Sequence, residues 1–204
     1  VWNVEYRRLG IAGGGWPGTW EDVAAATDQL HALAPDYALD LNRVVTLGHS
    51  AGGPLALWLA GRHRLPVASA LYRVDPLRPI GAISSAGVND LRAAFERNMG
   101  EGVLNQLLGG GPDAFPDRYA SVSPPDLLPF GAPQLLIHGT ADTMVSLSVS
   151  EEHLQAARSA GDSAELVTIP GADHFQIRDP ASPHWAPARE AILRFCDQVA
   201  AVQA

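Results

Sequence analysis

The chain has 204 residues, a formal net charge of −8 and 47% hydrophobic residues, which suits a soluble globular domain with its own core. This composition excludes a disordered chain, a collagen and a coiled coil, and no apolar run approaches the ~20 residues that span a bilayer. The negative charge argues against binding to a nucleic-acid backbone. The single cysteine, Cys196, excludes an internal disulfide and a cysteine-rich metal site. We expect a cytoplasmic protein with no membrane or nucleic-acid partner.

Patterns typical of strands and helices alternate along the chain, which indicates an α/β domain whose mostly parallel sheet is flanked by helices. Short apolar segments predict the strands, and helix-like segments lie between them, of which the last has one apolar face. The expected strands cover residues 1–8, 43–47, 80–85, 134–138 and 164–169. The expected helices cover residues 19–33, 52–62, 148–159 and 186–202.

The first expected helix carries signals at both ends. Thr19 and Asp22 form the pattern of a capping box, in which the Thr19 hydroxyl binds early amides and the Asp22 carboxylate reaches back. Pro35 is expected to end the helix, because the backbone before a proline disfavours the helical conformation.

A long connection, about Leu91–Pro133, separates the third and fourth expected strands. A connection of this length is usually functional, and often it is a lid. The alternative is an insert that only packs over the sheet. Both interpretations describe a cap-like insert at about 91–133, and the sequence does not separate them.

The segment Leu47–Gly53 contains G-x-S-x-G directly after an expected strand and directly before an expected helix, which is the context of a nucleophile elbow. In such an elbow Ser50 stands exposed above the sheet, and Gly48 and Gly52 are needed because the turn leaves no room for side chains. His49 is expected to cover one side of the elbow. The backbone amide of Ala51 is expected to face a developing oxyanion.

A serine hydroxyl needs a base to accept its proton, and that base needs an orienting carboxylate. Asp142 follows the fourth expected strand and His174 follows the fifth, which is the chain order that this kind of elbow requires. Asp173 and Asp90 are weaker candidates for the acid. The other residues considered, which we interpret as structural, are His31, His63, His153, His184, Ser84, Ser85 and Cys196.

A second motif, Gly13–Gly18, matches G-x-G-x-x-G and raises the hypothesis of dinucleotide binding. Pro17 argues against it, because proline removes an amide from the loop that would hold the pyrophosphate. The acidic residue expected after the next strand is also absent, since that strand runs into Gly48. With no Walker A sequence and no metal-ligand spacing, we expect neither a cofactor nor a bound metal.

At these motifs the chain resembles the α/β-hydrolase superfamily, in the esterase and lipase branch with kynurenine-formamidase-like and prolyl-oligopeptidase-like hydrolases. The resemblance runs from Val1 to the final helix and implies one catalytic domain over residues 1–204. The segments that carry it are Glu5–Arg8, Gly48–Gly53, His138–Asp142 and Asp173–Phe175.

The resemblance also implies a His-Gly-Gly loop ahead of Val1–Arg8, which supplies the second oxyanion amide in this family. Nothing here matches that loop, so the second donor is expected to be missing from this chain. The resemblance implies that the chain begins at the family's fourth strand and is incomplete at its start. Val1–Arg8 would then lack a neighbouring strand.

These residues predict hydrolysis of a small carboxylic ester or activated amide through an acyl-enzyme on Ser50. An arylformamidase acting on N-formylkynurenine is the main alternative within enzymes. A peptidase is a weaker alternative, and a non-catalytic binding protein with the hydrolase fold is the alternative from another class.

Overall fold

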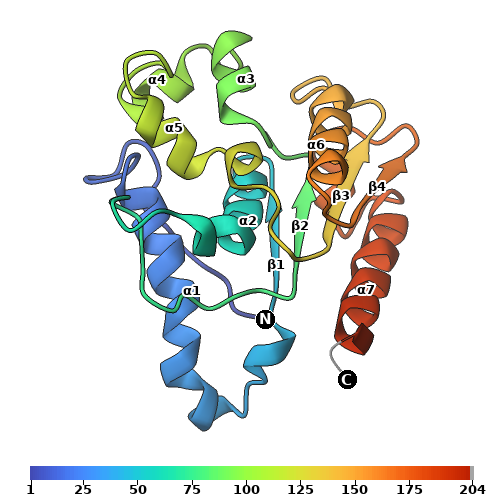
Figure 1. Cartoon of the computed structure of the whole chain (residues 1–204). Coiled ribbons are helices and arrows are strands. Elements are labelled where there is room, and N and C mark those ends of the chain that lie inside the picture. The colour runs from blue at the N-terminus through green and yellow to red at the C-terminus, as the bar shows by residue number, and fades with distance from the viewer. Residues whose placement is uncertain (203–204) are drawn as a thin grey trace.

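The computed structural model describes residues 1–202 and contains a four-stranded parallel sheet in the order β1-β2-β3-β4 (Figure 1). The strands are β1 (Val45–His49), β2 (Gly81–Ser85), β3 (Gln134–Gly139) and β4 (Ala164–Ile169). Every residue of β2 and β3 is buried, as expected for the central strands of a parallel sheet covered on both faces. The α/β class with a parallel sheet is confirmed.

Helices cover both faces of this sheet. On one face α2 (Gly52–Gly61) packs against β1 and β2, with α1 (Gly18–Tyr37) against α2. On the same face α6 (Leu147–Ser159) contacts β3 through the buried pair His138 and Ser150. On the other face α7 (Trp185–Val202) packs Phe195 against Ile83 and its neighbours.

The connection between β2 and β3 folds into short helices that pack on α2. They are α3 (Leu91–Glu96), α4 (Val103–Leu108), α5 (Pro116–Val122) and the 3-10 helix Pro124–Leu127. Figure 1 shows α3, α4 and α5 grouped at the end of the molecule toward which the strand arrows point. Trp58 of α2 is fully buried among them and donates from Nε1 to the carbonyl of Ser121 at 2.8 Å. The insert therefore shares a core with α2, and a role as a lid stays a prediction.

The strand expected at residues 1–8 is wrong for this structure. These residues form no ladder, and β1 is hydrogen-bonded only to β2 among the described residues. The segment instead lies along α1, where Trp2 donates to the carbonyl of Ala26 and Arg7 binds Asp22. A strand pattern becomes a strand only where a neighbouring backbone accepts and donates the ladder bonds, and these residues have none.

The expected capping box is also wrong. The cap position of α1 is Pro17, and no side chain caps the helix. The Thr19 hydroxyl accepts from the Gly15 amide at 3.0 Å and donates to the carbonyl of Arg7, so it serves the preceding loop. Asp22 is held by Arg7 and does not reach back to the helix start.

The expected helix stop at Pro35 is wrong by a few residues. Helix α1 contains Pro35 and continues to Tyr37, and Ala38 then closes it at a φ of +50°. Proline has no N–H to donate to the preceding turn, and in the last turn only that one intrahelical bond is lost.

No helix among residues 1–202 is long and apolar enough to cross a membrane.

Candidate active site

Ser50 occupies a sharp turn between β1 and α2, with a φ of +53° that non-glycine residues rarely adopt. Its amide donates to the carbonyl of Ser85 at the end of β2, at 2.9 Å, which fixes the turn on the neighbouring strand. Strain of this kind persists where the surrounding structure determines it, and it is common at functional sites. The turn has the strand–turn–helix context of a nucleophile elbow.

The glycines of this turn are not equivalent. A Cβ on Gly48 would overlap the carbonyl oxygen of Gly52, so position 48 has no room for a side chain. A Cβ on Gly52 would meet nothing within 4 Å, so the expectation that this position must lack a side chain is wrong. The crowded position on the helix side is Gly53, where a Cβ would lie 2.6 Å from the Cα of Gly87. The steric constraint falls on residue 53 because Gly53, not Gly52, faces the loop after β2.

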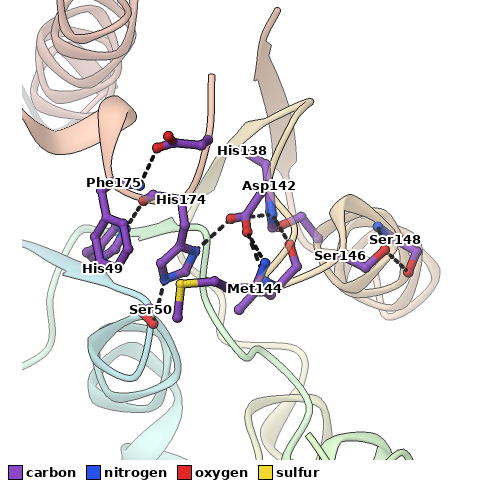
Figure 2. A network of polar contacts seen from close by, with 12 residues as sticks. His49, Ser50, His138, Asp142, Met144, Ser146, Ser148, His174 and Phe175 are labelled. Carbon is purple, nitrogen blue, oxygen red and sulfur yellow. Dashed lines mark hydrogen bonds and ion pairs between the residues drawn. The ribbon is translucent and has the colours of Figure 1, made fainter. Parts of the chain in front are cut away.

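Three side chains from three loops form one hydrogen-bonded chain at the carboxyl end of the sheet. His174 Nε2 lies 2.9 Å from the Oγ of Ser50, and His174 Nδ1 lies 2.7 Å from the Oδ2 of Asp142. Figure 2 shows the His174 imidazole between the other two groups, with one nitrogen toward each. His174 is 3% exposed and the Asp142 side chain is fully buried. This arrangement can pass a proton from the hydroxyl to the imidazole while the carboxylate holds the ring.

Asp142 is supported by its own loop. Its Oδ1 accepts from the amides of Met144 and Val145, both at 2.9 Å, while Oδ2 faces His174. Burial would raise the pKa of Asp142, but the bonds from Val145, His174 and Met144 outweigh it and hold that pKa below its ordinary value. The carboxylate therefore stays charged where a charge would orient the imidazole.

His49 lies beside this hydrogen-bonded network and stabilises the loop that carries His174. Its Nε2 donates to the carbonyl of His174 at 2.8 Å, and the two rings lie 4.7 Å apart. Burial lowers the pKa of His49, which favours the neutral ring. His49 thus covers one side of the elbow by a specific bond. Ala51 occupies the cap position of α2, at the positive end of the helix dipole.

The weaker acid candidates are engaged elsewhere. Asp173 accepts from the amides of Phe175 and Gln176, at the start of the 3-10 helix Gln176–Arg178. Asp90 caps α3 by accepting from two of its amides. Ser84 is fully buried and donates to Asn89 at 2.6 Å, which supports a structural role.

The glycine-rich loop Gly13–Gly18 uses its amides within the protein. Gly14 donates to the carbonyl of Ile11, Gly15 to the hydroxyl of Thr19, and Trp16 to the carbonyl of Leu107. These amides are therefore not free to hold a pyrophosphate. Within residues 1–202 no group of three or more His, Cys, Asp or Glu side chains is placed to hold a metal ion.

One residue at the site was not singled out from the sequence. His138 is fully buried in β3 and lies 3.3 Å from the Asp142 carboxylate. The only signal for it is a histidine at the end of an apolar strand, four residues before the acid. Such a histidine is usually a core residue, so its contacts became apparent only from the fold.

A family model described as BD-FAE matches residues 1–156. The chain belongs to this family. Its fold is that of an α/β-hydrolase of the esterase branch. A propionate-bound structure of the thermophilic esterase Est2 from Thermogutta terrifontis superposes with a TM-score of 0.73 at 25% identity, covering 96% of this chain and 70% of that one.

Two curated relatives are longer than this chain, which spans only part of each. The uncharacterized protein YfhR of Salmonella typhi is 28% identical and covers 96% of this chain. Dipeptidyl-peptidase 5 of Porphyromonas endodontalis is 25% identical and covers 80% of it. This chain spans 61% of the first relative and 22% of the second.

Proposed function

We propose that this chain is a serine hydrolase that cleaves small carboxylic esters through an acyl-enzyme. The observation that carries the proposal is a pair of linked hydrogen bonds. One joins the Ser50 hydroxyl to His174 at 2.9 Å, and the other joins His174 to Asp142 at 2.7 Å. Both distances are those of good hydrogen bonds, and each side chain comes from a different loop at the same end of the sheet.

In the proposed reaction Ser50 Oγ attacks the ester carbonyl while His174 Nε2 takes the hydroxyl proton. The carbonyl oxygen becomes negative and is stabilised by the Ala51 amide. His174 then gives its proton to the departing alcohol, and the acyl group remains on Ser50. A water molecule, activated by His174 in the same way, hydrolyses this acyl-enzyme and restores the hydroxyl. Asp142 stabilises the imidazolium in both halves.

We propose short acyl groups for the substrate. The esterase Est2, which covers almost all of this chain in the superposition, was solved with propionate bound. Propionate has the form of the acid half of an ester with a short acyl group, which supports this substrate class. The proposal is therefore a carboxylesterase for acyl groups of a few carbons, with a small alcohol or phenol as the leaving group.

The test is covalent labelling with a fluorophosphonate probe, combined with turnover of p-nitrophenyl acetate, p-nitrophenyl butyrate and N-formylkynurenine. We expect the wild type to be labelled and to cleave the two esters, and we expect Ser50→Ala to do neither. Ser159→Ala, at an exposed site on α6, is the control and should match the wild type. Equal labelling of Ser50→Ala would disprove the nucleophile, and faster turnover of N-formylkynurenine would replace the esterase by a formamidase.

A further inference from the structure

A second histidine lies against the acid of the proposed triad, on the side away from His174. His138 in β3 is fully buried, and both of its ring nitrogens have partners. Nε2 lies 2.9 Å from the carbonyl oxygen of Val145, and Nδ1 lies 2.8 Å from the hydroxyl of Ser150 in α6. The ring therefore joins the central strand, the acid loop and a helix.

These partners determine where the ring carries its hydrogen. A backbone carbonyl can only accept, so Nε2 of His138 must carry the N–H that binds Val145. In the neutral ring Nδ1 is then an acceptor, and the Ser150 hydroxyl donates to it. The Val145 carbonyl therefore selects one tautomer of His138, and the Ser150 hydroxyl, which can donate or accept, adjusts to it.

The same ring nitrogen also lies close to the carboxylate. His138 Nε2 lies 3.3 Å from Asp142 Oδ2, the same oxygen that lies 2.7 Å from His174 Nδ1. The other oxygen, Oδ1, is held by the amides of Met144 and Val145. His138 thus holds Val145 by its carbonyl, while the amide of Val145 holds Asp142. Figure 2 shows His138 and His174 on different sides of the Asp142 carboxylate.

We propose that His138 is a positioning residue, which fixes the Asp142 loop so that Oδ2 meets the imidazole of His174. This inference rests on the proposed function, since it assigns a role within the same triad. His138 is fully buried, so this role needs no contact with the substrate. Its loss should lower kcat and leave KM unchanged, because the carboxylate orients the base and does not bind the ester.

The experiment compares two amide substitutions at His138. The amide nitrogen of Gln reaches about as far as Nε2 of histidine, whereas the amide of Asn reaches only as far as Nδ1. We expect His138→Gln to retain the bond to Val145 and most of kcat for p-nitrophenyl acetate. We expect His138→Asn to lower kcat by about 10²-fold, the loss that a displaced catalytic group can cause. His153→Asn, at another buried histidine that binds Gln134, is the matched control and should keep the wild-type kcat.

A measurement on the unmodified protein avoids dependence on variants that fail to fold. Nitrogen chemical shifts of isotope-labelled histidine should show His138 protonated on Nε2 and unprotonated on Nδ1. The opposite tautomer would overturn the positioning role. If the wild type is active and folded His138→Asn has the same kcat, the positioning role is overturned. The proposed function is then left intact. A wild type without ester turnover would overturn the proposed function itself, and the positioning role with it.

Discussion

A methyl group on Gly48 would overlap the carbonyl oxygen of Gly52, because the backbone of β1 passes directly against the first turn of α2. The overlap involves backbone on both sides, so no side-chain rotation relieves it. The same turn leaves the Cβ direction of Gly52 open. Of the two glycines of the G-x-S-x-G motif, only Gly48 therefore lacks room for a side chain.

We expect Gly48→Ala to distort the elbow, to destabilise the fold by about 1–3 kcal/mol as overpacking does, and to abolish ester turnover. Gly52→Ala should fold with unchanged or slightly higher stability, since alanine is favoured over glycine in a helix by about 0.5–1 kcal/mol. Urea unfolding and kcat/KM for p-nitrophenyl acetate measure both effects. Equal losses in the two variants would contradict the difference in space.

Asp142→Asn should lower kcat by roughly 10⁴-fold, as loss of the orienting carboxylate does in a serine triad. The amide would present a donor where His174 Nδ1 needs an acceptor. Asp173→Asn is the matched control, because Asp173 is the neighbour of His174 in sequence but only accepts from loop amides. We expect that variant to retain kcat within a few-fold. A large loss in Asp173→Asn with full activity in Asp142→Asn would exchange the two assignments.

Buried His153 predicts a loss of stability in acid. Its Nε2 binds Gln134, and burial lowers the pKa of His153 to about 4. In the unfolded chain the pKa of histidine is near 6.5, so the unfolded state takes up the proton first as the pH falls. The stability from the neutral ring is complete above pH ~6.5 and decreases toward pH ~4, by up to about 3 kcal/mol.

Urea unfolding at a series of pH values measures this effect. His153→Leu should show a flatter profile between pH ~6.5 and ~4 than the wild type, because the variant lacks the buried imidazole at position 153. His31→Gln, at an exposed histidine of α1, should run parallel to the wild type. Parallel profiles for His153→Leu and the wild type would show that His153 is not the titrating group.

Trp58→Phe should weaken the attachment of the insert to α2. The buried indole donates to the carbonyl of Ser121 in α5, and phenylalanine leaves that carbonyl unpaired as well as a small cavity. We expect a loss of about 1–3 kcal/mol in urea unfolding. Trp2→Phe removes a similar bond to Ala26 at a half-exposed site, where water replaces the donor, and should cost under about 0.5 kcal/mol. Equal losses would show that burial does not set the difference.

The sequence predicted the parts of the fold that depend on local pattern. Strands β2, β3 and β4 match the apolar segments expected for them within a residue or two, and the helices after β1 and β3 match their expected ranges within a residue. One expectation that was wrong, the capping box at Thr19, concerns a group with a competing partner. The Thr19 hydroxyl could have accepted from an early amide of α1, but it accepts from the amide of Gly15 in the preceding loop.

The sequence by itself determined the fold class, the elbow and the three side chains of the proposed triad, because strand periodicity, turn chemistry and loop order are local properties of the chain. Only the tertiary structure decided which glycines of the elbow have no room for a side chain. It also decided that residues 1–8 form no strand and that His138 lies against Asp142. Each of these depends on a contact between segments that are distant in sequence or that turn back on each other. Periodicity predicts which face of an element is buried, but the atom that meets a given side chain is determined by how the elements pack.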